Sequence, residues 1–349
     1  MSNFTGVETV QPAARPGHLS KPYLTVVAPC FNEEEVILIT HKRLTQACLN
    51  AVGEDHEIIY VNDGSNDQTW NILESISNTE SRVLAIKLSR NFGHQAALTA
   101  GLHFASGQRI LMIDADLQDP PELLNGMLAK MDEGYDVVYG QRIARDGETA
   151  FKKSSASLFY KLLTKLTDID IPQDTGDFRL ISRRCLQAML QLPEQHRFVR
   201  GMVAWLGFRQ AAFPYHRQAR AAGTTKYPLK RMLRLATDAI TGFSTRPLRI
   251  TIYFALLAFL SSVGLTIYAM VSWLLFDVVK GWTSLLIVMS MTSAANFLCL
   301  GIFGEYLGRL FMESKRRPIY IVEEVAGGPS LPAGLRNDVD VDAPGPHRR

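Results

Sequence analysis

The chain has 349 residues, enough for one large domain or two modest ones. Its formal net charge is only +3, and this near balance gives no sign of nucleic-acid binding through bulk charge. Polar sequence runs to about Arg249, and the apolar stretches 250–276 and 285–304 that follow contain no charged residue. Each stretch is long enough to cross a bilayer core of roughly 30 Å, so we expect two membrane-spanning helices.

Basic residues flank both apolar stretches and predict how the chain is oriented. They are Lys226, Lys230, Arg231, Arg234, Arg246 and Arg249 before the first stretch, and Arg309, Lys315, Arg316 and Arg317 after the second. Because Lys and Arg concentrate on the cytoplasmic side of membrane proteins, we expect both flanks there. The sequence therefore predicts a multi-pass protein of the plasma or inner membrane, with its N-terminal domain in the cytoplasm.

The polar part alternates β-rich apolar runs with helical patterns. We expect strands at 23–29, 57–61, 83–88, 109–114 and 136–140, with helices between them, including one over 92–104. Such alternation predicts an α/β fold with a mostly parallel sheet and helices on both faces. A dinucleotide-binding oxidoreductase would need G-x-G-x-x-G after the first strand, and the turn from Ala28 to Glu33 contains no glycine. We therefore exclude that class.

The stretch 109–122, RILMIDADLQDPPE, ends an apolar strand in closely spaced acids. Asp114 and Asp116 are two residues apart, so in an extended chain their carboxylates point the same way and repel. Mg²⁺ or Mn²⁺ would remove this repulsion, and the Gln118 amide oxygen could serve as a third ligand. The alternative is a solvated strand end followed by a turn. Polar clusters at 29–33 and 62–65 follow two other expected strands, where ligands of α/β sheets bind, and this favours the metal site.

The segment just before the first apolar stretch predicts an amphipathic helix. Leu229, Met232, Leu233, Ala236, Ile240 and Phe243 recur at helical spacing, with Lys230, Arg231 and Arg234 between them. A basic amphipathic helix is suited to lie on an anionic membrane surface. A helix that faces the domain core is the alternative.

Several motifs, in this order, resemble glycosyltransferase family 2. They are PCFNEEE, VNDGSNDQT, DADLQDPPE, GQR at Gly140–Arg142 and TGDFRL at Thr175–Leu180. FSTRPLR before the apolar stretches and GEYLGR near their end resemble the polyprenyl-phosphate branch, which includes bactoprenol glucosyltransferases and dolichol-phosphate mannose synthases. The resemblance covers about residues 23–322. It implies a Rossmann-like nucleotide-sugar-binding domain of the GT-A type.

The resemblance also implies roles for individual residues. Asp63 matches the acid that contacts the nucleotide base, and Asn62 departs from the family because many members have a second Asp there. We therefore leave Asn62 out of the metal site. The other matched positions are Pro29, Phe31 and Glu33 for nucleotide contact, and Asp114, Asp116 and Gln118 for the metal on the donor diphosphate.

The implied reaction is a metal-dependent, inverting transfer of a hexose, expected to be glucose from UDP-glucose, to polyprenyl (undecaprenyl) phosphate. A phosphate monoester is largely anionic at neutral pH because its second pKa is near 6. It needs positive charge more than a base, and Arg142, Arg179 and Lys226 are the candidates, with solvated surface charge as the alternative. Asp177, together with Asp116, is the candidate catalytic carboxylate. Asp177 could instead pair with Arg179 and orient it.

Other functions stay open at this level. GDP-mannose, UDP-galactose or an aminosugar donor could replace UDP-glucose. A processive polysaccharide synthase is less favoured, because Q-x-x-R-W is missing and two spans make a poor channel. A non-catalytic membrane scaffold is opposed by the intact Asp114 and Asp116 pair. We also expect a homo-oligomer, by resemblance.

The expected organisation divides the chain into five parts. They are a flexible tail at 1–20, a cytoplasmic glycosyltransferase domain at 21–225, an interfacial helix region at 226–248, a two-helix transmembrane region at 249–311 and a cytoplasmic tail at 312–349.

Overall fold

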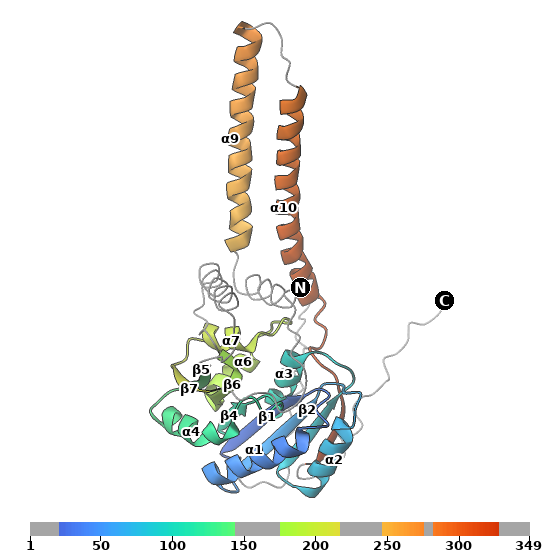
Figure 1. Ribbon diagram of the computed structural model, residues 1–349, viewed down its shortest axis with the longest axis vertical. Helices are drawn as coiled ribbons and strands as arrows, with labels where there is room; N and C mark the ends of the chain where they lie inside the picture. The colour runs from blue at the N-terminus through green and yellow to red at the C-terminus, as the bar shows by residue number, and fades with distance from the viewer. Residues whose placement is uncertain (1–20, 144–174, 217–245, 276–281, 328–349) are drawn as a thin grey trace, which may run out of the picture.

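The computed structural model describes residues 21–143, 175–216, 246–275 and 282–327. An α/β domain occupies one end of the molecule, and two long helices project from it (Figure 1). Most of the expected interfacial helix region, including Lys226, lies outside the described residues. The expected tail at 1–20 lies outside them too.

One eight-stranded sheet forms the centre of the domain, in the order β7-β5-β6-β4-β1-β2-β3-β8. The strands are β1 (Leu24–Cys30), β2 (His56–Asn62), β3 (Val83–Leu88), β4 (Arg109–Met112), β5 (Val137–Arg142), β6 (Thr175–Ser182), β7 (Gln210–Tyr215) and β8 (Val322–Gly327). The five strands expected from sequence are confirmed, and β6, β7 and β8 are additional. The sheet is mixed rather than mostly parallel, because β6 runs antiparallel to β4 and β5, and β8 runs antiparallel to β3.

Helices cover both faces of the sheet, as expected from sequence. They are α1 (Ile37–Val52), α2 (Thr69–Thr79), α3 (His94–Phe104), α4 (Leu124–Asp132), α6 (Arg183–Leu190) and α7 (Val199–Trp205), with a short 3₁₀ turn at Pro121–Leu123. Helices α1, α2 and α4 pack on one face, and α3, α6 and α7 pack on the other. Alternation along β1 separates the two cores, since Val26 faces the first and Val27 the second.

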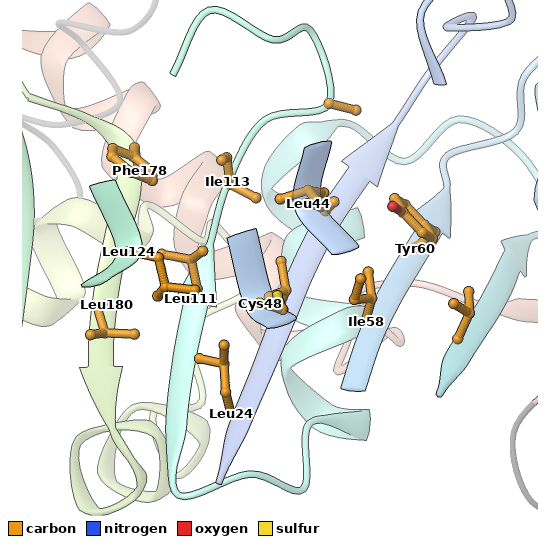
Figure 2. Packing of buried hydrophobic residues seen from close by; sticks show 14 of the residues in the cluster. Leu24, Leu44, Cys48, Ile58, Tyr60, Leu111, Ile113, Leu124, Phe178 and Leu180 are labelled. Atoms are coloured by element: carbon orange, nitrogen blue, oxygen red, sulfur yellow. The ribbon is translucent and has the colours of Figure 1, made fainter. Parts of the chain in front are cut away.

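Buried aliphatic side chains join α1 to the centre of the sheet (Figure 2). Leu24, Ile58 and Leu111 come from three neighbouring strands and share one apolar cluster with Leu44 and Cys48 of α1. All five are at most 2% exposed. Complete burial of one such aliphatic side chain stabilises the fold by about 1.5–3 kcal/mol relative to exposure. This core holds the carboxyl ends of β1, β2 and β4 in fixed relative positions.

Strand β8 lies inside the region 312–349 that the sequence indicated as a tail. It pairs antiparallel with β3, with Val325 opposite Ile86, and the Ser89 amide donates to Ile321 O at 3.0 Å. Val322 and Val325 pack against the second core. The chain that leaves the long C-terminal helix is therefore tied to the edge of the sheet.

Helices α9 (Arg246–Leu275) and α10 (Trp282–Ser314) contact each other and carry large exposed apolar side chains. Phe259 of α9 and Phe297 of α10 are 64% and 73% exposed. Several side chains inside both helices lie outside the described set. Among the described residues, no helix has the length and apolar character needed to cross a membrane, so the two expected transmembrane helices are not supported there.

Candidate active site

Three loops meet at the carboxyl edge of the parallel strands β1, β2 and β4. The Asn32 amide donates to Ser65 Oγ at 2.9 Å, which joins the loops after β1 and β2. The Thr40 hydroxyl of α1 donates to Ala115 O at 2.7 Å, which joins α1 to the loop after β4. The three polar clusters expected to converge do lie together.

Strand β6 brings Asp177 to this edge, because β6 runs antiparallel to β4. Met112 lies opposite Arg179, so two residues beyond the end of β4 the chain comes beside Asp177. His94 at the start of α3 confirms this proximity: its Nε2 lies 3.4 Å from Asp114 Oδ1 and 3.1 Å from Asp177 Oδ2. The two candidate acids, distant in sequence, therefore share one histidine.

The first nucleotide motif lies where β1 passes into α1. Pro29 is buried in β1 and pairs with Val61, whereas the Phe31 ring is 42% exposed. The Glu33 carbonyl accepts the amides of the first residues of α1, and its own amide donates to Thr69 Oγ1 at 2.8 Å. The structure therefore places Phe31 where it is open to a ligand, and the nucleotide-contacting roles of Pro29, Phe31 and Glu33 stay predictions.

Asp63 is buried and serves the loop before α3. Its carboxylate accepts the amides of Phe92 at 2.7 Å and Gly93 at 3.0 Å. Burial raises the pKa of Asp63, while these two amides oppose the rise. Both oxygens are thus engaged within the protein, and the predicted contact to a base stays a prediction. The neighbouring Asn62 accepts the Ser65 amide at 3.2 Å, and its exclusion from the metal site stays a prediction.

The predicted metal ligands lie on a tight loop after β4. The backbone N–H of Gln118 donates to Asp116 Oδ1 at 3.2 Å, and Leu117 between them has a positive φ of 59°. Asp114 Oδ1 is buried without a hydrogen bond among the described residues. Burial raises the pKa of Asp114 to about 6; His94 opposes the rise, and Asp177, Asp119 and Asp116 add to it.

A hard divalent cation fits this set of oxygen donors, because it would relieve the repulsion between the carboxylates. Within the described ranges, no cluster of three or more His, Cys, Asp or Glu side chains could hold a metal. The predicted set instead consists of the two carboxylates of Asp114 and Asp116 and the amide of Gln118. Its role as a metal site stays a prediction.

Asp177 is buried and surrounded by donors. Its Oδ2 accepts Gln95 Nε2 at 2.8 Å and lies near His94, while its Oδ1 lies 3.1 Å from Arg200 Nε. Burial by itself raises the pKa of Asp177, but Arg200 and His94 hold it well below its usual range. Burial also lowers the pKa of His94, but the hydrogen bond to Asp177 and the charge of Asp114 raise it to about 9. At neutral pH, Asp177 is anionic and His94 is cationic.

The two described arginines that were predicted to bind the acceptor, Arg142 and Arg179, have partners within the protein. The Arg179 guanidinium is buried, which lowers its pKa to about 10, and it donates to Gly176 O at 3.0 Å. Arg142 Nη2 lies 3.9 Å from Asp119 Oδ1, and its Nε contacts the Tyr215 hydroxyl at 3.4 Å. Both arginines are within the site, and their acceptor roles stay predictions.

Sequence reasoning missed the residues that hold Asp177 in place. His94, Gln95 and Arg200 were not among the site residues predicted from the sequence. Their positions next to RNFG and within QHRFVRG gave the only signal, and neither segment has a spacing that predicts contact with a residue so far along the chain. Among the described residues, Asp177 forms ion pairs with Arg200 and His94, and its role in orienting Arg179 stays a prediction.

The fold and this edge define an α/β enzyme whose site lies at the carboxyl ends of parallel strands. Residues 25–190 match the family described as Glycosyl transferase family 2. The Bacillus subtilis protein "Uncharacterized glycosyltransferase YkcC" is 48% identical over 306 residues, which cover 87% of this chain and 94% of that protein. The chain belongs to glycosyltransferase family 2 and is a glycosyltransferase with a mixed sheet of the GT-A type.

Two further relatives carry a more specific name. The bactoprenol glucosyl transferase of Shigella phage SfV is 35% identical over 86% of this chain and 98% of that protein. The prophage bactoprenol glucosyl transferase homolog of Escherichia coli K12 is 36% identical over 86% of this chain and 99% of that protein.

Solved structures are similar at a lower level. Glucosyl-3-phosphoglycerate synthase from Mycobacterium tuberculosis, in complex with Mn²⁺, UDP and phosphoglyceric acid, aligns with a TM-score of 0.43 and 18% identity, over 63% of this chain and 76% of that one. Staphylococcus aureus TarS aligns with a TM-score of 0.40 and 20% identity, over 63% and 66%. At these values the likeness carries no conclusion about ligands.

Proposed function

We propose that this enzyme transfers a hexose, with glucose from UDP-glucose as the expected donor, to polyprenyl phosphate. The relatives named bactoprenol glucosyl transferase support this acceptor, because their similarity to this chain extends over nearly their whole length. The observation in the structure that carries the proposal is the position of Asp114 and Asp177 on either side of His94. This edge of the sheet therefore carries carboxylates that could bind a metal ion, and beside them the positively charged His94.

Asp114, Asp116 and Gln118 would hold a Mg²⁺ or Mn²⁺ ion. When bound, such an ion neutralises negative charge that develops on the departing nucleoside diphosphate. The fit rests on Asp114 Oδ1, which among the described residues has no hydrogen bond and only the ion contact to His94, and on the burial and neighbouring carboxylates that raise the pKa of Asp114.

The acceptor phosphate oxygen would attack the anomeric carbon while the bond to the diphosphate breaks and its electron pair leaves with the diphosphate. A single displacement of this kind inverts the configuration at that carbon. The acceptor is already an anion at neutral pH, so the step releases no proton that needs a base. Asp177, held ionised by Arg200 and His94, therefore serves to orient cationic groups.

Positive charge around this edge would bring two anionic substrates together. His94 is a cation at neutral pH, and Arg142 and Arg179 lie in the same neighbourhood. We propose Arg142, Arg179 and Lys226 as acceptor-phosphate ligands, although the two described arginines already have protein partners.

We further propose that the enzyme works at the plasma or inner membrane, as a multi-pass protein with its catalytic domain in the cytoplasm. A polyprenyl acceptor is anchored in lipid, and the described side chains of α9 and α10 include many large exposed apolar groups, such as Phe259, Phe297 and Phe303. Lipid is the environment that fits such a surface. A homo-oligomer stays part of the proposal.

The donor can be identified directly. Membranes that contain the protein would be incubated with undecaprenyl phosphate, Mg²⁺ or Mn²⁺ and a panel of labelled nucleotide sugars, including UDP-glucose, UDP-galactose and GDP-mannose. Label that enters the lipid phase from UDP-glucose alone supports the proposal. Label from another donor would change the sugar, label in polymer would indicate a processive synthase, and no label in either fraction would contradict lipid-linked transfer.

A further inference from the structure

Asp177 is held by residues from two different helices. Gln95 of α3 donates to Asp177 Oδ2 through its Nε2 at 2.8 Å, and its Oε1 accepts the Val199 amide at 2.9 Å. Arg200 of α7 approaches Asp177 Oδ1 at 3.1 Å. One carboxylate therefore connects the start of α3 with the first turn of α7.

Arg200 contacts both ends of one short segment of β6. Its Nη1 donates to Thr175 O at 2.8 Å, while its Nε faces Asp177. The side chain is 22% exposed, and its guanidinium lies near the Phe198 ring, whose centroid is 5.5 Å from Cζ. Two of its donor atoms are thus directed at the protein rather than at a ligand.

This arrangement fixes where His94 can lie. His94 Nε2 is shared between Asp177 at 3.1 Å and Asp114 at 3.4 Å. If Arg200 were removed, the buried Asp177 carboxylate would lose one of its two ion partners and keep only His94, and breaking such a pair from one side is costly. His94 would then be drawn toward Asp177 and away from Asp114.

We propose that Arg200 is a positioning residue for sugar transfer and acts through Asp177. Together with Gln95, it fixes the Asp177 carboxylate so that Oδ2 holds His94 beside Asp114. The inference names a residue beyond the proposed site, and its kinetic test rests on the proposed function because it uses the transfer reaction. Arg200 itself does not contact the reacting groups.

The kinetic test compares Arg200→Gln and Arg200→Lys with the matched control Arg197→Gln in the full chain. Arg197 lies just before α7, whereas Arg200 lies within its first turn, and Arg197 donates to the backbone carbonyls of Met189 and Leu192. Misplacement of a catalytic group by about 1 Å can cost about 100-fold in rate, so we expect Arg200→Gln to lower kcat by about 10- to 100-fold. The donor KM should stay within about threefold, and Arg200→Lys should recover part of kcat.

Two kinetic results would overturn the proposal. An unchanged kcat in Arg200→Gln would show that the pair has no part in transfer. A donor KM that rises as much as kcat falls would show that Arg200 binds substrate directly. Arg197→Gln should leave kcat and KM close to those of the wild type, and a loss equal to that of Arg200→Gln would assign the effect to general damage near α7.

A thermal double-mutant cycle tests the same coupling without any substrate. The unfolding midpoints of Arg200→Gln, Asp177→Asn and the double variant would be compared with the wild type. If Arg200 acts through Asp177, the double variant should unfold no earlier than the worse single variant. Additive shifts would overturn the coupling. If the wild type transfers no sugar to lipid, the proposed function fails by itself, and this cycle still decides whether Arg200 acts through Asp177.

Discussion

Gly64 is the residue whose replacement tests the architecture of the site most sharply. It has a φ of +65°, and a Cβ placed on it would lie 2.4 Å from Arg90 C and 2.5 Å from Asn91 N. Both are backbone atoms, so no rotamer change can relieve the overlap. Gly64→Ala must therefore displace the chain that Asp63 holds through the Phe92 and Gly93 amides.

The expected cost has two parts. A left-handed backbone costs a non-glycine residue about 1–2 kcal/mol. Displacing the loop weakens the hydrogen bonds of a buried carboxylate, at about 1–3 kcal/mol for a group left unsatisfied. We therefore expect Gly64→Ala to lose roughly 2–5 kcal/mol of unfolding free energy, a large share of the total of a typical domain. Transfer activity should fall with it, because the same loop leads into His94.

Gly53→Ala is the matched control for the backbone term. Gly53 combines a φ of +61° with a ψ of −137°, a conformation that non-glycine residues rarely adopt, and a Cβ added to it would meet no atom within 4 Å. Only a conformational cost of about 1–3 kcal/mol therefore applies to Gly53→Ala. Urea unfolding of the full chain measures both variants, and sugar transfer is assayed in parallel. Equal losses of stability in the two variants, with activity retained in Gly64→Ala, would refute the reasoning.

Four further changes probe the metal site, the acceptor and the electrostatics of the fold. Asp116→Ala should abolish chelator-sensitive transfer while the protein still folds, and near-normal turnover would remove the metal-site proposal. Asp114→Asn should also abolish transfer, yet in chelator it should unfold at the same temperature as the wild type or higher, because burial and the neighbouring acids raise the pKa of Asp114 to about 6; a lower midpoint would contradict this. Asp136→Asn should destabilise the protein at neutral pH, and this loss should shrink as the pH falls below about 4. Arg184 and Ser182 lower the pKa of Asp136, so its contribution is present above an unfolded pKa of about 4 and is lost as the pH falls through the folded value; parallel pH profiles for variant and wild type would oppose it. Lys226→Ala should raise the KM for lipid phosphate more than that for the nucleotide sugar, and equal changes would argue against an acceptor role.

The sequence predicted the strands correctly where a buried strand is also a continuous run of apolar residues. The five expected strands match β1 to β5 to within a few residues, because each is a short apolar run bounded by turn residues. Strand β4 ends at Met112, two residues earlier than expected, where the chain turns toward Asp114. The antiparallel β6 was missed although every residue in it is buried, because Asp177 and Arg179 break its apolar pattern.

The two edge strands, β7 and β8, were not predicted from the sequence, each for its own reason. β7 contains Pro214, and a proline demotes a run from strand to non-strand unless it lies at a sheet edge, as β7 does. β8 begins Val322-Glu323-Glu324 and has little apolar character. Its place is determined by pairing with β3 after a long helix, which is information that local sequence does not contain.

The site was predictable only in part. Asp114, Asp116 and Asp177 could be selected from motifs, and the structure brings Asp114 and Asp177 to one histidine. The roles of Gln95 and Arg200 arise from packing of α3 and α7 against β6, which brings Gln95 to Asp177 across 82 positions and brings Arg200 to the same carboxylate from another helix. No local spacing encodes that contact.

The central claim is lipid-linked sugar transfer at this edge of the sheet, and one measurement tests it most directly. The purified full chain would be given UDP-[¹⁴C]glucose and undecaprenyl phosphate, with added Mn²⁺ or with chelator, and the lipid extract would be counted. We predict label in a glucosyl lipid that requires both the metal and the lipid phosphate. Label that reaches the lipid equally well in chelator would contradict the metal site, and no label from any tested nucleotide sugar would contradict the proposed function.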